Sequence, residues 1–286
     1  MIAAQKTRYP TKALKAVPVR LQKSLGGISI GLIALLTYIF LFTPIIVLIV
    51  FSFNASKSMA VWNGFTLEWY KTLLGDRYIL QALRNSLIVG VTAATISTAI
   101  GTITALVLVR RDFFGKELFS TLMLSPLVLP EIVIGVAFLV FMVFLNIKLG
   151  FFTLITGHVV LTIPYSTLIV RASASGLDIS LEEAAADLGA NPWRVFRWIT
   201  LPLLIPGVLT AFLLTFTISF DDFVISMFTA GVGTTTLPLR IFSMLKLGIT
   251  PEINALGSIL IMLNLLMILV IGGQQLRKLM GGEAVG

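Results

Sequence analysis

Residues 178–202 read DISLEEAAADLGANPWRVFRWITLP, a polar segment that separates two long apolar runs. Ser180 and Glu183 have the spacing of a capping box, so a helix is predicted to begin at this serine. The acidic residues and alanines that follow favour the first turns of a helix. Gly189 is placed to end it in a left-handed conformation. The first half of the segment therefore predicts one short helix with a sharp end.

The second half of the segment carries the signals of another helix. Asn191 and Pro192 have the pattern of an N-cap followed by the first helical residue. Residues 193–199 would form this second short helix, and Pro202 would begin the next apolar run. The whole segment is thus predicted to be a helix–turn–helix that projects from two hydrophobic helices.

Composition and apolar runs indicate an integral membrane protein. Of the 286 residues, 57% are hydrophobic and only 12% are charged, whereas roughly a quarter of a soluble chain is charged. A helix crosses a bilayer with about 20 apolar residues, and helices satisfy every backbone polar group inside the lipid. We expect an all-α chain whose membrane domain, residues 28–276, lies between the tails 1–27 and 277–286. Its six transmembrane helices are predicted near 28–53, 80–109, 118–145, 153–177, 203–228 and 253–276.

The distribution of the positive charge indicates how the chain is oriented in the membrane and does not indicate binding to nucleic acid. The formal net charge is +8, and the segment before the first apolar run carries six Lys and Arg residues with no acid among them. Basic residues mark the cytoplasmic side of membrane helices. With six crossings, both termini and the segment 178–202 would be cytoplasmic, and most of the 21 Lys and Arg residues would lie on that side. No nucleic-acid partner is expected.

The polar segment resembles the signature of binding-protein-dependent ABC importer permeases. That signature is Glu-Ala-Ala, three residues, Gly, nine residues, Ile, one residue and Leu-Pro. This chain has Glu183, Ala184 and Ala185, then Gly189, then Ile199, Leu201 and Pro202. The resemblance implies a type I ABC importer permease fold in a bacterial inner membrane. It also implies a cytoplasmic coupling helix, in which Glu183, Ala184, Ala185 and Gly189 couple the chain to an ATPase.

The same resemblance implies partners. They are a homologous second permease subunit, a dimer of ATP-binding subunits that binds ATP and Mg, and an extracytoplasmic substrate-binding protein. Within the family, the runs Ser219–Phe223, Leu237–Leu239 and Pro251–Leu256 are similar to the second permease subunit of polyamine importers. Putrescine or spermidine is the implied substrate. Permeases for other organic amines and for phosphonates share parts of these runs, so those substrates stay open.

Several kinds of site are missing from the sequence. There is no cysteine, which excludes disulfides and thiolate sites, and the single histidine, His158, leaves little scope for a metal site. His158 is interpreted as a packing residue. No P-loop is present, since Arg110 stands where the first glycine before Gly115–Lys116 would be needed. The chain is therefore predicted to be a transport subunit with no enzymatic step and no cofactor of its own.

Three acids fall inside predicted crossings: Glu131, Asp221 and Asp222. A carboxylate there costs about 2.5–3.5 kcal/mol on insertion scales, so it usually faces a cavity or a partner. We interpret the three as a path for an organic cation, with Tyr165, Phe220 and Phe223 adding cation–π contacts. Alternatively, the aspartates are solvated at the outer interface and Glu131 pairs with a basic residue of a partner.

The neighbouring aspartates differ by about 100° around a helix, so they belong to different faces. Thr215, Ser219, Asp222 and Ser226 make one polar stripe, and Thr217 and Asp221 belong to another. Which stripe faces the path stays open. Two other functions also stay open: an ion-coupled secondary transporter, which leaves the Glu-Ala-Ala signature unexplained, and a membrane scaffold, which leaves the acids unexplained.

Overall fold

The computed structural model describes residues 25–57, 61–248, 250–263 and 265–266. The chain divides between Leu48 and Ile49 into two compact units. Apart from an isolated β-bridge between Asn54 and Phe65, every regular element within these ranges is helical. The expected all-α fold is confirmed.

Four helices in the described part of the chain are long and apolar enough to cross a membrane. They are Gly31–Phe51 within α1 (Leu25–Phe51), α3 (Arg77–Arg110), α6 (Phe151–Ser175) and the continuous stretch Pro192–Asp221. The sequence of α1 is apolar around its whole circumference, as expected of a helix surrounded by lipid. The first, second and fourth predicted crossings agree with α1, α3 and α6 to within a few residues.

The third predicted crossing, 118–145, is broken rather than continuous. Helix α4 (Lys116–Leu124) runs into the 3₁₀ turn η1 (Ser125–Leu127), and α5 (Glu131–Phe144) follows at an angle of 104°. The predicted crossing is interrupted here because Pro126 and Pro130 supply no amide hydrogen for the helical ladder. Glu131 is therefore the first residue of α5 and does not lie in mid-helix.

The fifth crossing begins earlier and ends earlier than predicted. Helix α8 (Pro192–Val195), the π-helical turn η2 (Phe196–Thr200) and α9 (Leu201–Asp221) form one continuous span. Residues 193–199 are helical as predicted, but they continue into α9 and do not form a separate helix, and Pro202 does not start the crossing. In the π-helical turn, the Leu201 amide bonds the Phe196 carbonyl, and this altered ladder lets the helix continue past the proline. At the other end the helix stops at Asp221, and α10 (Val224–Thr229) follows a break.

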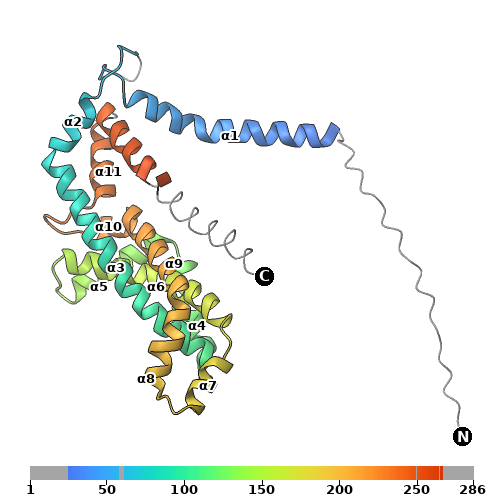
Figure 1. Cartoon of the computed structure of the whole chain (residues 1–286). Helices are drawn as coiled ribbons and strands as arrows, with labels where there is room; N and C mark the ends of the chain where they lie inside the picture. The colour runs from blue at the N-terminus through green and yellow to red at the C-terminus, as the bar shows by residue number, and fades with distance from the viewer. Residues whose placement is uncertain (1–24, 58–60, 249, 264, 267–286) are drawn as a thin grey trace, which may run out of the picture. The chain divides into compact units, whose positions relative to one another are not determined.

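The helices α3, α6 and α9 pack together and form the centre of the second unit (Figure 1). Close packing depends on small residues: a side chain on Gly101 of α3 would collide with Ser166 of α6. The Ser97 and Thr162 hydroxyl oxygens lie 2.6 Å apart, and Ser166 donates to the Ser97 carbonyl at 2.7 Å. Small residues and interhelical hydrogen bonds of this kind stabilise helix pairs in lipid.

Short helices surround the N-terminal end of α3. They are α2 (Glu68–Gly75), α11 (Leu237–Leu247) and an apolar helix at Pro251–Leu263. Trp69, Leu73, Ile79, Leu237 and Leu256 join these elements in one hydrophobic cluster. The helix at 251–263 coincides with the start of the sixth predicted crossing, 253–276. The rest of that crossing and the two predicted tails lie almost entirely outside the described residues.

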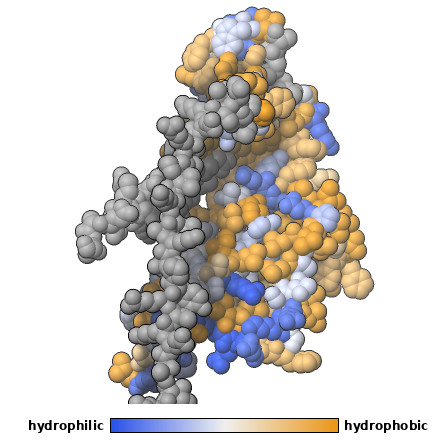
Figure 2. Space-filling model, turned by 90° about the vertical axis from the view of Figure 1, so that its right-hand side faces the viewer, coloured by the Kyte–Doolittle hydropathy of each residue, from blue (hydrophilic) through white to orange (hydrophobic). Residues whose placement is uncertain are grey.

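Apolar side chains dominate the outside of the bundle. Figure 2 shows them over much of one face, interrupted by smaller polar groups. Exposed examples on α5 are Val140, Phe141 and Phe144. Contiguous exposed apolar surface marks a membrane or a protein partner, so the surface agrees with a chain that spans lipid.

Candidate functional site

The segment 178–202 begins with the helix α7 (Ser180–Asp187). The predicted start is confirmed, but the predicted capping box is wrong. Ile179 is the N-cap residue, and the Asp178 carboxylate accepts the Ser180 backbone amide at 2.9 Å. This hydrogen bond lowers the pKa of Asp178, which stays ionised beside the positive end of the helix. Asp178, which precedes the N-cap residue, therefore accepts the first backbone amide of α7.

Helix α7 ends in a left-handed turn at Gly189, as predicted. Gly189 has φ +86°. Its amide bonds the Ala186 carbonyl at 2.9 Å, and the Ala190 amide bonds the Ala185 carbonyl at 3.0 Å. This pair of bonds is a Schellman motif, which satisfies carbonyls that the helix end would leave free. The turn is thus fixed by the backbone alone.

Asn191 then starts α8, also as predicted. Its side-chain oxygen accepts the Arg194 amide at 2.9 Å, and Pro192 takes the first helical position. The chain therefore reverses between α7 and α8 through the left-handed turn at Gly189 and the Asn191 cap. The two helices form a stiff projection at one end of the bundle (Figure 1).

The projection exposes the residues of the Glu-Ala-Ala signature and several large apolar side chains. Glu183, Ala184 and Gly189 are exposed, and Ala185 is half-buried. Leu188, Trp193 and Trp198 are exposed by 90%, 66% and 73%. Large exposed apolar groups mark a surface that a protein partner or the membrane covers.

Glu182 connects the projection to the membrane helices. One carboxylate oxygen accepts Arg110 Nη2, at the end of α3, and the Thr200 hydroxyl, just before α9, each at 3.0 Å. Both charged side chains are largely buried, with 16% of Arg110 and 23% of Glu182 exposed. These contacts line a groove of about 460 Å³ together with Arg111 and Phe196. We name this link the Arg110–Glu182–Thr200 strap.

The sequence pattern predicted a functional role for Glu183 but none for Glu182. The strap joins residues 72 and 18 positions apart, and no local spacing predicts such contacts. The available signal was the position of Arg110 at the end of a predicted crossing, where an unpaired buried charge would be costly.

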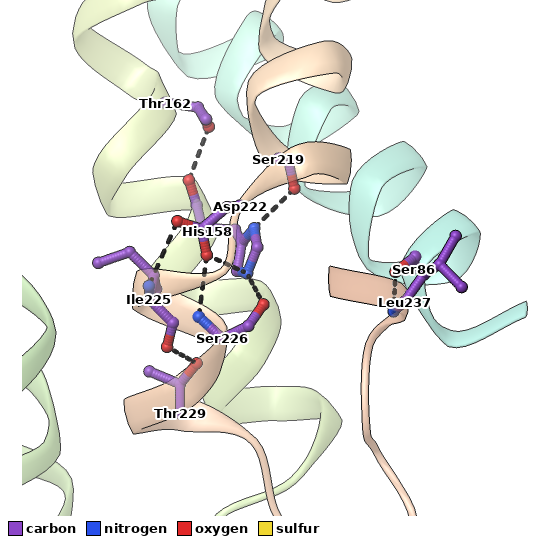
Figure 3. A network of polar contacts seen from close by, with 9 residues as sticks. All are labelled: Ser86, His158, Thr162, Ser219, Asp222, Ile225, Ser226, Thr229 and Leu237. Atoms are coloured by element: carbon purple, nitrogen blue, oxygen red, sulfur yellow. Dashed lines mark hydrogen bonds and ion pairs between the residues drawn. The ribbon is translucent and has the colours of Figure 1, made fainter. Parts of the chain in front are cut away.

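Asp222 and His158 form a buried polar network at the break between α9 and α10 (Figure 3). Asp222 accepts the amides of Ile225 and Ser226 at 3.3 and 2.9 Å and so caps α10. His158 Nδ1 lies 2.8 Å from the Ser219 hydroxyl, and Nε2 lies 3.1 Å from the Ser226 hydroxyl and 3.5 Å from the Asp222 carboxylate. His158 is fully buried and hydrogen-bonded, which confirms its interpretation as a packing residue.

The two polar stripes of the fifth crossing separate clearly. The stripe with Asp222 is buried inside the protein: Thr215, Ser219, Asp222 and Ser226 are all buried. Asp221 is exposed and, with Thr217 and Phe220, lines a mostly apolar cavity of about 220 Å³. Side chains of α3, α11 and the helix 251–263 complete the wall. Of the two aspartates, Asp221 is the one beside a cavity.

The other predicted path residues are not in the wall of this cavity. Glu131 is exposed at the start of α5, within electrostatic range of Asp222. Tyr165 is half-buried on α6. The Phe223 ring packs against the Phe242 ring with 4.5 Å between centroids. The structure thus brings Phe220 and Asp221 together and places the remaining four elsewhere.

Comparisons with known proteins agree on one family. Residues 97–278 match the family of the binding-protein-dependent transport system inner membrane component. The spermidine/putrescine transport system permease protein PotC of Escherichia coli K12 is 41% identical over 232 residues, which cover 81% of this chain and 88% of PotC. The putrescine transport system permease protein PotI of the same organism is 40% identical over 236 residues, or 80% of this chain and 84% of PotI.

Solved structures share the fold. A chain of a bacterial ABC transporter involved in the import of the acidic polysaccharide alginate superposes with a TM-score of 0.66 at 15% identity, over 88% of this chain and 96% of that one. A chain of the MetNI methionine ABC transporter, in an inward-facing conformation, gives a TM-score of 0.54 at 18% identity, over 75% and 99% of the two chains. At such identities the likeness concerns the fold alone.

Proposed function

This chain belongs to the family of binding-protein-dependent inner-membrane transport components, within its polyamine permease subgroup, and we propose that it is one permease subunit of an ATP-driven importer of putrescine or spermidine. The identity to PotC and PotI over about four fifths of the chain supports the substrate class. A second permease, an ATPase dimer and an extracytoplasmic binding protein complete the proposed assembly.

The observation that carries the proposal is the geometry of the projection formed by α7 and α8. It is stiff, it exposes Leu188, Trp193 and the Glu-Ala-Ala signature, and the strap joins it to α3 and α9. A partner ATPase that moves this projection would move two membrane helices with it. We therefore assign Glu183, Ala184, Ala185 and Gly189 to the contact with the ATPase.

In the proposed cycle, this chain performs no chemical step. The partner ATPases bind ATP and Mg and approach one another, and the projections transmit that movement to the permease pair. The path for substrate then switches from facing the cytoplasm to facing the binding protein. ATP hydrolysis resets the assembly.

We assign the cation path to the acids and aromatics around the end of α9. Asp221 has the strongest support, since it lines a cavity beside Phe220. A carboxylate attracts an ammonium group, and an aromatic ring adds roughly 0.5–2 kcal/mol of cation–π attraction. Glu131, Asp222, Tyr165 and Phe223 would contribute in other states of the cycle or through the partner permease.

Uptake of radiolabelled polyamine into proteoliposomes tests the proposal. The full assembly should accumulate substrate only with ATP inside the vesicles and loaded binding protein outside. Asp221→Asn should lower the uptake rate about fivefold or more, since about 1 kcal/mol of charge attraction is lost. Asp112→Asn is the matched control, because Asp112 is exposed and its ion pair is with Lys116. Uptake by this chain without an ATPase, driven by an ion gradient, would instead establish a secondary transporter.

A further inference from the structure

A small polar pocket lies at the N-terminal end of α3, at the opposite end of that helix from the projection (Figure 1). The pocket has a volume of about 310 Å³. Helix α3 has 34 residues and is therefore about 50 Å long. If the projection faces the cytoplasm, the pocket faces the outside. Its lining residues are Tyr78, Gln81, Ala82, Asn85, Gly233, Thr235, Arg240 and Ser243.

The frame of the pocket is held firmly. Asn85 of α3 donates to the carbonyls of Gly233 and Thr235 at 3.1 and 3.0 Å. The amide of Leu237, the first residue of α11, donates to the Ser86 hydroxyl at 2.8 Å (Figure 3). These bonds fix the segment before α11 and the start of α11 onto α3. The pocket is therefore a built feature and not a gap between loops.

Arg240 of α11 stands in this pocket, and its side chain makes no hydrogen bond within the described residues. Its guanidinium lies 5.3 Å from the centre of the Tyr78 ring, and Nη2 forms an ion pair of 3.7 Å with Asp76 Oδ2, which is too long for a hydrogen bond. The other carboxylate oxygen of Asp76, Oδ1, caps α3 by accepting the Tyr78 and Ile79 amides. Arg240 Nε and the hydroxyl of Thr236 are buried and have no hydrogen-bond partner among the described residues.

An arginine whose side chain makes one long ion pair and no hydrogen bond among the described residues, next to an exposed tyrosine, is suited to bind a further carboxylate. Guanidinium groups bind carboxylates through two parallel hydrogen bonds, and buried donors without partners are rare in native proteins. A cationic substrate would be repelled by Arg240. A phospholipid would need an apolar wall for its acyl chains, and no large aliphatic side chain of the described residues lines this pocket.

We propose that this pocket is a docking point for the extracytoplasmic binding protein, and that Arg240 receives a surface Asp or Glu side chain of that protein. The inference rests on the proposed function, since it requires a binding protein as partner. Tyr78, whose side chain is 70% exposed, would pack beside the incoming carboxylate. Arg240 would then help to set the affinity of the permease for the loaded binding protein.

The test uses the complete assembly in nanodiscs and measures ATP hydrolysis against the concentration of loaded binding protein. Arg240→Gln should raise the half-saturating concentration about tenfold, which corresponds to 1.4 kcal/mol. Arg240→Lys keeps the charge but loses the planar fork, and its shift should be smaller. Lys246→Gln is the control: this residue is on the same helix but lies over the Phe242 ring and does not line the pocket.

Charge reversal identifies the partner group. Arg240→Glu should weaken docking further, and one Asp→Lys or Glu→Lys change on the surface of the binding protein should restore it. An unchanged half-saturating concentration in Arg240→Gln, in an assembly that still contains the ATPase, would overturn the inference. A shift that disappears when anionic lipids are replaced by zwitterionic lipids would overturn it in favour of a lipid headgroup. If the unmodified assembly does not respond to any loaded binding protein, the proposed function fails first.

Discussion

Gly189 determines how the chain reverses between α7 and α8. Its φ of +86° lies in the left-handed region, where a β-carbon meets the following carbonyl oxygen. No neighbouring atom lies within 4 Å of the position that a β-carbon would take. A larger residue at this position would therefore be resisted by its own backbone and not by surrounding side chains.

Gly189→Val is expected to disturb the projection while the protein remains in the membrane. A β-branched residue in this conformation costs at least about 1–2 kcal/mol, which is enough to shift the short turn toward other conformations. Less ATPase should co-purify with the variant, or hydrolysis should respond less to loaded binding protein. Gly189→Asn is the matched control, since asparagine tolerates the left-handed region. Equal coupling in the valine and asparagine variants would show that the turn is not required.

The role of a single residue could be predicted from the sequence where it depends on contacts with residues nearby in the chain. Gly189 and Asn191 follow from positions in the sequence that only a few residue types occupy. The capping box failed for the same local reason: Asp178 and Ser180 are both good capping residues, and spacing alone does not rank them. The carboxylate of Asp178 accepts the Ser180 amide, which the capping box would have paired with the Glu183 side chain.

At the level of elements, the strap explains how the projection can act on the membrane helices. Glu182 of α7 contacts α3 through Arg110 and the start of α9 through Thr200. Both bonds are 3.0 Å long, within the ordinary range of hydrogen bonds, and both charges are mostly shielded from water. A displacement of α7 would therefore pull on two helices that also pack against each other.

Reversing the charges of the strap tests this transmission. Arg110→Glu and Glu182→Arg should each lower polyamine uptake per ATP hydrolysed severalfold, because a buried charge that loses its partner costs about 1–3 kcal/mol or more. The double variant should recover part of that loss, since the pair is restored with opposite orientation. The control is Lys116→Gln, which removes an exposed ion pair with Asp112 of little expected value. A double variant no better than the worse single variant would contradict a direct role of the pair.

Helix breaks were harder to predict than helices. Hydropathy is high on both sides of the break at 128–130 and of the break after Asp221, so a search for apolar runs joins the halves. The first break has a local cause, because Pro126 and Pro130 by themselves predict an interruption of the helical ladder. The second has no proline. It depends on Asp222 capping α10 beside His158, a residue more than sixty positions away in the chain.

At the scale of the whole molecule, the two functional regions lie at opposite ends of α3. The strap ends at Arg110, and the pocket that contains Arg240 begins at Tyr78. Positive-inside counting predicted this arrangement, since it placed the segment 178–202 and the loop before α11 on different sides. The pocket itself was not predictable, because the approach of Arg240 to Asp76 joins residues far apart in the chain. Sequence patterns assign sides of a membrane, whereas cavities depend on packing.

Cysteine labelling tests the orientation directly, because the native chain has no cysteine. Lys57 and Val232 are exposed in segments predicted to lie outside, and Phe114 and Leu188 are exposed in segments predicted to lie inside. Single Lys57→Cys and Val232→Cys variants should react with a membrane-impermeant maleimide in intact spheroplasts. Phe114→Cys and Leu188→Cys should react only after the membrane is permeabilised.

Two inner positions are needed because a bound ATPase would cover Leu188, whereas Phe114 precedes α4 and lies outside the projection. Labelling of every variant after lysis in detergent is the control for reactivity. Reaction of Phe114→Cys or Leu188→Cys in intact spheroplasts would reverse the orientation. The projection would then face away from any cytoplasmic ATPase, and the pocket at Arg240 would face away from any extracytoplasmic binding protein. A single inverted result would therefore contradict both the coupling assignment and the docking inference, which is why this experiment should precede the others.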